Sequence, residues 1–268
     1  MPSMLFLGTG GSSGVPDGTC DCEICAKAHD TNSRFFRTRS SALIENDGKF
    51  LLLDCGSDFW FQTVRWNVKR IDAVLLSHNH EDHMGGITNL RAYASTYKDE
   101  RPPLPLYLRA NELRELKSRF AFIFDNQIQT SKPKIDTRII AHGDTMDLFG
   151  LKITVFDVSH PPEDALGFRI NDLAYIPDVK EIPDKSLKLL EGIDTLVMMA
   201  NSDKPYPKQM SIFEAAEVAK RRTLRTVLIA CAILAVLGAW FFWGLIFGGR
   251  DLPKQPPMKV PGTLQQKQ

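Results

Sequence analysis

The sequence predicts an α/β domain of two packed sheets with helices outside, followed by one transmembrane helix. Three observations favour this prediction. Short apolar runs typical of strands alternate with helical stretches, a histidine-rich loop follows one of those runs, and residues 226–249 carry no charged side chain. Strands interspersed with helices are typical of a single α/β domain. We therefore divide the chain into a folded domain at 1–222, a transmembrane helix at 223–249 and a disordered tail at 250–268.

The composition is that of an ordinary globular protein. Hydrophobic residues make up 43% of the 268 residues and charged residues 24%, which excludes a wholly disordered chain and a polytopic membrane protein. Lys and Arg number 33 against 32 Asp and Glu, for a formal net charge of +1. So balanced a charge gives no general attraction to a polyanion, and we expect no nucleic acid partner.

Ten strands are expected along the domain, in runs rich in β-branched and large apolar residues. The second and third form a hairpin, because Asn46-Asp47-Gly48 between them is a strong two-strand turn signal. The expected strands are Met4–Gly8, Ser41–Glu45, Lys49–Asp54, Ala73–Leu76, Leu104–Leu108, Thr137–Ala141, Leu151–Val158, Leu166–Ile170, Leu173–Ile176 and Thr195–Met199.

Three helical stretches accompany the strands. Two are expected over Asp82–Tyr97 and Asn111–Phe124. The third begins at Ile212, because Ser211 and Glu214 have the spacing of a capping box. No Gly or Pro follows in it before residue 238, so we expect this helix to continue into the membrane segment.

The predicted membrane helix is long enough to cross a bilayer, since a helix rises about 1.5 Å per residue and the hydrocarbon core is about 30 Å thick. Basic residues are denser before the segment than after it, and the N-terminus has no secretory signal pattern. The basic residues are Lys220, Arg221, Arg222 and Arg225 before, and Arg250 and Lys254 after. We therefore expect a membrane anchor with the folded domain in the cytoplasm.

The histidine-rich loop His78-Asn79-His80-Glu81-Asp82-His83 is the most informative motif in the sequence. In an extended loop, residues two apart point the same way, so His78 and His80 can present imidazoles to one metal. Asp82 and His83 can face a second ion. Mixed nitrogen and oxygen ligands suit Zn²⁺, with Mn²⁺ or Fe as alternatives.

Four further motifs accompany the loop in order, and together they resemble the metallo-β-lactamase superfamily over residues 4–221. The motifs are LGTGGSSGVP at 7–16, CDCEIC at 20–25, RTRSSALI at 37–44 and LLLDCGSD at 51–58. They are most similar to the branch of the phosphoribosyl cyclic phosphate phosphodiesterases, which is related to the tRNA 3′-end nucleases. The resemblance implies a four-layer αββα sandwich with a two-metal site at one edge.

The resemblance also implies a ligand set. His78, His80 and His160 would hold one metal, and Asp82, His83 and a bridging Asp178 the other. Asp82 and Asp178 would act in catalysis, with Asp178 orienting a metal-activated water, and Asp54 would hydrogen-bond a ligand imidazole. Judged by spacing alone, His160 and Asp178 are equally compatible with metal ligands and with ordinary surface or turn residues.

A cysteine cluster offers a separate metal site. Cys20, Cys22 and Cys25 supply three thiols, one fewer than a closed structural zinc site needs. In the phosphodiesterase branch the fourth ligand is a histidine near the C-terminus, whereas this chain has no histidine after His160. His29 could complete a local site, and an incomplete site is the alternative.

The C-terminal end departs from the family pattern. Tyr206 and Gln209 stand at the positions where the family carries histidines, and the uncharged segment stands where the family has a strand and a loop with the last ligand of the second metal. The sandwich is therefore expected to be truncated at its C-terminal end, with a weakened second metal site and no histidine as general acid.

Two functions follow from these observations. The first is a metal-dependent hydrolase, a phosphodiesterase acting on a small cyclic or diester phosphate, with lactones and thioesters as less favoured substrates. The second is a catalytically impaired, membrane-tethered binding or scaffold protein of the same fold. The expected partners are a small phosphate ester and, through the C-terminal helix, the membrane, and a homodimer is left open.

Overall fold

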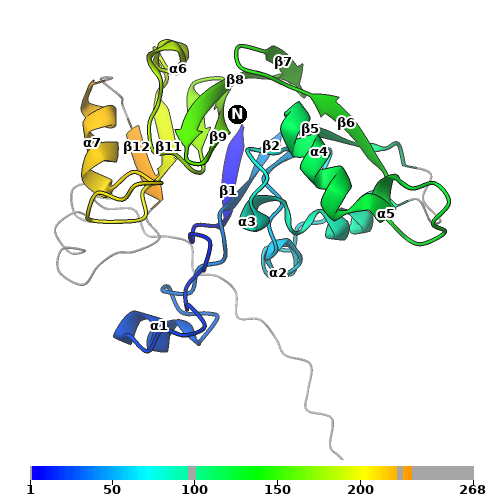
Figure 1. Cartoon of the computed structure of the whole chain (residues 1–268), viewed down its shortest axis with the longest axis horizontal. Helices are drawn as coiled ribbons and strands as arrows, with labels where there is room; N and C mark the ends of the chain where they lie inside the picture. The colour runs from blue at the N-terminus through cyan, green and yellow to red at the C-terminus, as the bar shows by residue number, and fades with distance from the viewer. Residues whose placement is uncertain (1, 96–100, 222–225, 231–268) are drawn as a thin grey trace, which may run out of the picture. The chain divides into compact units, whose positions relative to one another are not determined.

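The fold consists of two six-stranded sheets (Figure 1). The computed structural model describes residues 2–95, 101–221 and 226–230. The first sheet has the order β1 (Ser3–Gly8), β2 (Ser41–Asn46), β3 (Lys49–Leu53), β4 (Ala73–Leu75), β5 (Leu104–Leu108) and β6 (Ile135–Ile139). The second has the order β12 (Thr226–Ala230), β11 (Thr195–Met199), β10 (Leu173–Ile176), β9 (Glu163–Ile170), β8 (Leu151–His160) and β7 (Thr145–Leu148).

Short helices connect and cover the strands. They are α1 (Glu23–Ala28), α2 (Phe59–Arg65), α3 (Glu81–Met84), the 3₁₀ helix η1 (Ile87–Ala92), α4 (Ala110–Arg119), α5 (Ala121–Phe124), α6 (Asp184–Leu189) and α7 (Ile212–Arg221). Sequence patterns did not predict α1, α2, α6 or strand β7. The three helices are shorter than the span over which helical periodicity can be read, and β7, Thr145–Leu148, is not a continuous apolar run.

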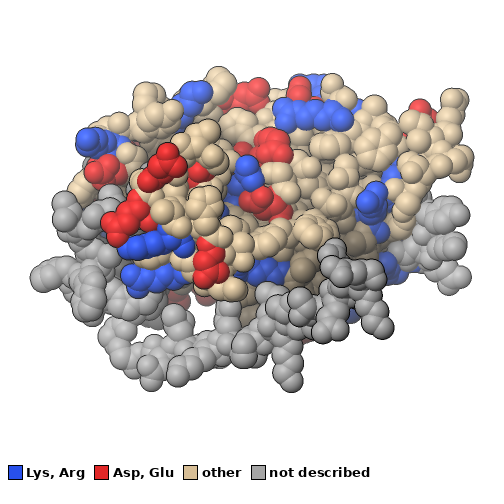
Figure 2. All heavy atoms as spheres, turned by 90° about the horizontal axis from the view of Figure 1, so that it is seen from below, with Lys and Arg blue, Asp and Glu red and all other residues tan. Residues whose placement is uncertain are grey.

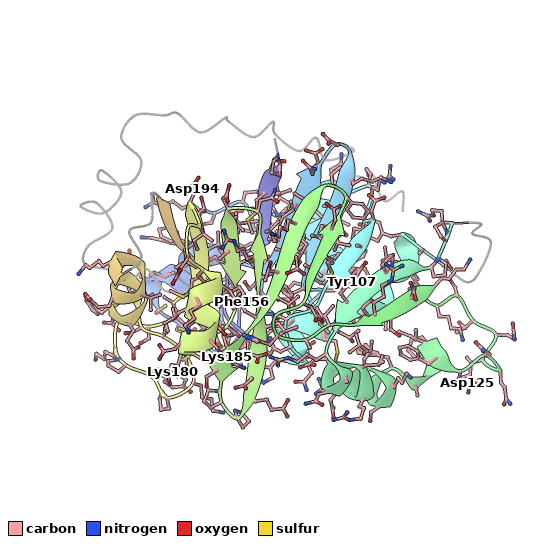
Figure 3. All side chains as sticks on the ribbon, turned by 90° about the horizontal axis from the view of Figure 1, so that it is seen from above. Tyr107, Asp125, Phe156, Lys180, Lys185 and Asp194 are labelled. Atoms are coloured by element: carbon pink, nitrogen blue, oxygen red, sulfur yellow. The ribbon has the colours of Figure 1, made fainter. Side chains whose placement is uncertain are left out.

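The core between the two sheets follows from the alternation of side chains along the strands. On β3, Leu51 and Leu53 are buried together with Phe168 and Val155 of the second sheet, whereas Leu52 is buried among residues of the covering helices. Figure 3 shows Tyr107 on β5 and Phe156 on β8, one in each sheet. Each fully buried leucine contributes about 1.5–3 kcal/mol through the hydrophobic effect.

Both sheets bury their outer faces against helices. Outside the first sheet, Leu52 shares a core with Phe59 of α2 and Leu90 of η1. Outside the second, Phe156 shares a core with Ala215 of α7. The predicted four-layer αββα arrangement is therefore confirmed.

Two local predictions are confirmed in detail. The hairpin of β2 and β3 turns through Asp47 and Gly48, both with positive φ (49° and 73°), as a turn of this kind requires. At the start of α7 the Ser211 amide donates to Glu214 Oε2 at 2.7 Å, and the Glu214 amide donates to Ser211 Oγ at 3.3 Å. These reciprocal bonds form the expected capping box.

The two long helices predicted after the histidine loop are wrong in extent. The stretch expected as one helix over Asp82–Tyr97 is divided into α3 and η1 at Gly85 and Gly86. A Cβ on Gly86 would lie 2.1 Å from Gly56 O, so this close backbone contact requires glycine there. The stretch Asn111–Phe124 is likewise divided into α4 and α5 at Phe120.

The C-terminal prediction also needs correction. Helix α7 ends at Arg221, and Thr226–Ala230 forms β12, paired in parallel with β11, so no helix continues through this point. A short apolar run rich in β-branched residues fits a buried strand as well as a helix, and here an edge of the sheet was open to it. The strand that the family pattern calls for after the last helix is therefore present.

No helix within the described residues is long and apolar enough to span a membrane. Most of the predicted membrane segment, residues 231–249, lies outside the described residues, as does the predicted tail at 250–268. The chain divides into two compact units, Met1–Ile233 and Leu234–Gln268, and the strands and helices above all belong to the first. The membrane anchor over residues 231–249 stays a prediction, whereas β12 places residues 226–230 in the folded domain, beyond the boundary expected at residue 222.

Candidate metal centre

The candidate ligands gather at one edge of the sandwich because four strands end there. β3 and β4 run parallel, and their C-terminal ends lead into Asp54 and the histidine loop. In the second sheet β8 and β10 both run antiparallel to β9, so their C-terminal ends also share an edge. They carry His160 and Asp178. His160 is the last residue of β8 rather than a residue beyond the strand, because β8 extends two residues further than expected.

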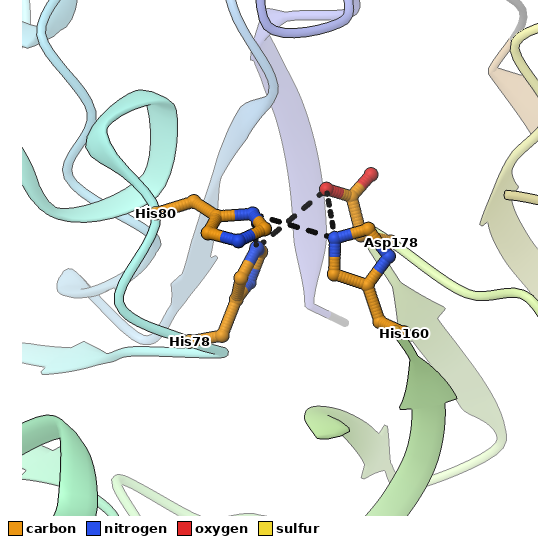
Figure 4. Close-up of side chains that lie close together, drawn as sticks. All are labelled: His78, His80, His160 and Asp178. Carbon is orange, nitrogen blue, oxygen red and sulfur yellow. Dashed lines mark hydrogen bonds and ion pairs between the residues drawn. The ribbon is translucent and has the colours of Figure 1, made fainter. Parts of the chain in front are cut away.

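Three imidazole nitrogens converge at the first group of ligands (Figure 4). His80 Nδ1 lies 3.0 Å from His78 Nε2 and 3.3 Å from His160 Nε2. Asp178 Oδ2 lies 3.6 Å from both His78 Nε2 and His160 Nε2. These four side chains can direct one atom each to a common point, which is the geometry of a metal site.

The imidazoles of His78 and His80 are favoured in the neutral form. Burial lowers the pKa of His78 well below its ordinary value, and the charges of His83, His80 and His160 act in the same direction. Burial and the charge of His160 also lower the pKa of His80. Neutral imidazoles offer lone pairs to a metal at neutral pH.

A second group shares the same aspartate. His83 Nε2 lies 3.4 Å from Asp82 Oδ2 and 3.3 Å from Asp178 Oδ2. Burial alone would lower the pKa of His83, but Asp54, Asp178 and Asp82 together raise it well above its ordinary value. Without a metal, His83 therefore balances the surrounding carboxylates as an imidazolium, and a bound metal would displace its proton.

Asp54 fixes the position of the His83 ring through Nδ1, the nitrogen that does not face Asp82 and Asp178. Its Oδ2 lies 2.7 Å from His83 Nδ1, and the Ser77 amide donates to its Oδ1 at 2.7 Å. Asp54 is fully buried and has a positive φ of 62°, an uncommon conformation outside glycine that the surrounding hydrogen bonds maintain. The contact keeps a proton on Nδ1 and turns Nε2 toward Asp82 and Asp178, where a bound metal would replace the Nε2 proton.

Ser77 is a residue of the site that the sequence patterns did not single out. Its hydroxyl donates to Asp54 Oδ2 at 2.8 Å and lies 2.9 Å from His78 Nδ1. It thereby joins the carboxylate behind one ligand group to an imidazole of the other. A polar residue directly before the first histidine, at the end of an otherwise apolar strand, was the available signal.

The segment that departs from the family pattern lies against the site. His160 Nδ1 donates to the Lys208 carbonyl at 3.0 Å, and Gln209 Nε2 donates to Asp178 Oδ1 at 3.3 Å. Tyr206, the other residue at a family histidine position, is 51% exposed. Of the two replaced positions, only that of Gln209 has a side-chain contact to a candidate ligand among the described residues.

The donor set fits transition metals. In the first group the facing nitrogens of His78, His80 and His160 lie 3.0 and 3.3 Å apart, close enough to direct three lone pairs at one ion. In the second group the two carboxylates of Asp82 and Asp178 face one imidazole. The structure therefore brings together all six predicted ligand residues, with Asp178 common to both groups.

The cysteine cluster forms only in part. The Sγ atoms of Cys20, Cys22 and Cys25 lie within 4.8 Å of one another, but His29 does not belong to the group. Cys22 is the N-cap of α1 and His29 its C-cap, so the helix separates them by about 10.5 Å at about 1.5 Å per residue. The structure therefore does not group His29 with the three thiols, and its role as a fourth ligand stays a prediction.

His142, which we interpret as structural, lies away from both groups. Its Nδ1 accepts a hydrogen bond from the Asp157 amide at 3.1 Å, and it therefore ties the strand β8 to the turn before β7. This contact makes His142 a suitable control in tests of the six candidate ligands.

Comparison with known proteins agrees with this architecture. The family profile described as "Beta-lactamase superfamily domain" matches residues 49–229. A diphosphatase from the PhnP family has a similar structure, with a TM-score of 0.77 and 28% identity over 86% of this chain and 87% of that one. Zn²⁺-bound PqqB from Methylobacterium extorquens gives a TM-score of 0.61 and 26% identity over 76% and 75%.

One curated relative is a larger protein. The octanoyltransferase of Porphyromonas gingivalis is 28% identical over 215 residues, which cover 80% of this chain but 42% of that protein. The chain therefore spans about two fifths of the length of this relative. The family profile covers β3 to β12, which include every candidate ligand and Asp54. By its fold, its histidine and aspartate cluster and this match, the chain belongs to the metallo-β-lactamase superfamily.

Proposed function

We propose that the chain is a two-metal hydrolase, with zinc as the first choice of metal and Mn²⁺ as an alternative, that cleaves small cyclic or diester phosphates. The observation that carries the proposal is the position of Asp178 Oδ2, 3.3 Å from His83 Nε2 and 3.6 Å from His78 and His160. One carboxylate oxygen shared by two ligand groups is suited to two ions a few ångströms apart. The similarity to the PhnP-family diphosphatase supports a phosphate ester as substrate.

Each residue has a defined task in this reaction. Two bound ions would lower the pKa of a water and offset the negative charge on the phosphoryl oxygens. His78, His80 and His160 supply the neutral lone pairs of one group. Asp178, lying between the groups, accepts a hydrogen bond from the attacking water and orients it for in-line attack. Asp82, a member of the second group, would offset the positive charge of the ion held there.

The residue beside Asp178 limits the substrates that can react well. Gln209 stands where the family pattern has a histidine, and an amide does not release a proton at neutral pH. A leaving group must therefore depart with little protonation. We expect aryl phosphodiesters and other substrates with weakly basic leaving groups to react much faster than alkyl diesters.

The charges on the face shown in Figure 2 favour a small substrate. On the face shown in Figure 2, Lys and Arg lie among Asp and Glu and do not gather into one basic area. A large polyanion gains affinity from such areas, whereas a small phosphate ester needs only the metal site.

The test is hydrolysis of bis(p-nitrophenyl) phosphate by the full chain loaded with Zn²⁺ or Mn²⁺. His160→Ala and Asp82→Ala should each lower turnover by about 100-fold or more. Loss of a residue that only hydrogen-bonds a metal ligand already costs about 10–100-fold in metal affinity or activity, and these variants remove ligands themselves. His142→Ala, which alters a histidine outside both groups, should leave turnover unchanged. Equal turnover in all four proteins would contradict the proposal.

A second candidate function rests on the same replaced position. Gln209 in place of a histidine is also what a catalytically impaired binding protein would carry. A catalytically impaired binding protein of this kind would bind metal but would not turn over aryl or alkyl diesters, lactones or thioesters. The hydrolysis assay therefore separates the two functions directly.

A further inference from the structure

Gln209 is held beside Asp178 by backbone contacts on both sides. The Lys208 carbonyl accepts a hydrogen bond from His160 Nδ1 at 3.0 Å, and the Met210 amide donates to the Val179 carbonyl at 2.8 Å. The residue before Gln209 is thus tied to one candidate ligand, and the residue after it to the neighbour of another. The Gln209 side chain has little freedom to leave the site.

The orientation of the Gln209 amide is fixed by its two neighbours. A carboxylate only accepts hydrogen bonds, so the nitrogen faces Asp178 Oδ1, at 3.3 Å. The Gln209 oxygen then accepts from Asn201 Nδ2, at the C-terminal end of β11. The Asn201 oxygen is buried and has no hydrogen-bond partner among the described residues, so Asn201 acts here only as a donor.

These contacts give the two Asp178 oxygens different partners. Oδ1 accepts from Gln209, while Oδ2 faces His78, His83 and His160 at 3.3–3.6 Å. Without the Gln209 bond, the carboxylate could rotate and offer one oxygen to each ligand group.

We propose that Asn201 and Gln209 form a hydrogen-bond relay that positions Asp178, so that a single oxygen is shared between two metal ions. Gln209 is a positioning residue in this role, not a ligand. The inference rests on the proposed two-metal function and explains how the chain keeps a second site although it lacks the histidine of the family pattern.

The relay matters most for the second group. The first group keeps three imidazoles when Asp178 moves, whereas the second keeps only Asp82 and His83. Loss of a hydrogen bond behind a ligand typically costs 10–100-fold in metal affinity. Disrupting the relay should therefore lower the affinity for the second metal equivalent and change the affinity for the first by no more than about threefold.

The experiment is calorimetric titration of the metal-free full chain with Zn²⁺, repeated with Co²⁺ so that the absorption of the second ion can be followed. Gln209→Ala should weaken the second equivalent by about 10–100-fold. Gln209→His, whose ring N–H can still donate to Asp178, should restore it to within severalfold of the wild type.

Asn201→Asp tests the relay at a residue that contacts no candidate ligand. An aspartate accepts and cannot donate, so it turns the Gln209 nitrogen toward itself and presents the Gln209 oxygen to Asp178. The second equivalent should weaken as in Gln209→Ala. Asn126→Asp, the same change at an exposed position, is the matched control and should titrate like the wild type.

Three results would overturn the proposal. The first is binding of only one metal equivalent by the wild type, and the second is an unchanged affinity for the second equivalent in both Gln209→Ala and Asn201→Asp. The third is an equal loss of affinity for both equivalents together with a fall in the melting temperature of the metal-free chain. Failure of the hydrolytic function would look different. It would give two normal equivalents, the predicted effects of the variants on the second, and no turnover of any phosphodiester.

Discussion

Asp54 Oδ2 lies 2.7 Å from His83 Nδ1, inside a core where both side chains are almost fully buried. The carboxylate comes from the end of β3 and the imidazole from α3. Their contact joins the first sheet to the helix that carries two candidate ligands. The charge and the tautomer of His83 both depend on this one carboxylate.

Replacing Asp54 by Asn should weaken metal binding while keeping the shape of the side chain. The amide carries no charge, so the Nδ1–H bond of His83 weakens and the basicity of Nε2 falls. We expect about a 10–100-fold loss in affinity for the metal at His83, measured by titration of the metal-free chain. Asp136→Asn, on the exposed surface of β6, is the control. Equal affinities in the two variants would exclude this role for Asp54.

The backbone behind the site has no room for a side chain at Gly56. A Cβ there would lie 1.8 Å from the carbonyl oxygen of Asp82, so Gly56→Ala must push α3 away from β3. Overpacking of a core typically costs about 1–3 kcal/mol, and we expect the upper end because the contact is backbone to backbone. Urea unfolding measures the loss. Gly18→Ala, with no atom within 4 Å of the new Cβ, should change stability little, and similar values for both variants would contradict the account.

The capping box of α7 predicts a stability change in acid. The Lys180 side chain and the Ser211 backbone and hydroxyl lower the pKa of Glu214 from 4.5 to about 2. Because the folded pKa is the lower one, the stabilisation is complete above pH 4.5 and is lost as the pH falls from there toward about 2. The difference in unfolding free energy between wild type and Glu214→Gln should therefore shrink over this interval. A difference in unfolding free energy that stays constant from pH 6 to pH 2.5 would contradict the prediction.

The cysteines should differ sharply in reactivity. Cys22 is exposed, and a hydrogen bond from the Cys25 amide, followed by contacts with neighbouring thiols, lowers its pKa. Burial raises the pKa of Cys55 well above the ordinary value. Iodoacetamide at pH 7.5 should therefore modify Cys22 long before Cys55, as read by peptide mass, because the thiolate is the reactive form. Faster labelling of Cys55 would contradict the prediction.

Much of the site could be predicted because its residues lie in short, self-contained patterns. The histidine loop carries four candidate ligands within six residues, and its position after an apolar strand indicates a sheet edge. His160 and Asp178 were less accessible to local patterns. They reach the loop only because β8 and β10 end at the same edge, which is a property of the sheet order and not of local sequence.

The errors have a common physical origin. Whether Thr226–Ala230 becomes a helix or a strand depends on an open edge beside β11. The glycine at residue 86, between α3 and η1, is required by the backbone of Gly56, 30 residues earlier. The hydrogen bond from Gln209 to Asp178 likewise joins segments that the sequence alone leaves unconnected. In each case a tertiary contact decided between local alternatives of similar energy.

The central claim is that two ligand groups share Asp178 and hold two metals. The most direct test is the metal content of the full chain, measured by mass spectrometry after loading with Zn²⁺, for the wild type, Asp82→Ala and His160→Ala. We expect two metals per chain in the wild type, loss of the second-group metal in Asp82→Ala and weaker binding of the first-group metal in His160→Ala. One metal or none in the wild type, or two in all three proteins, would contradict it.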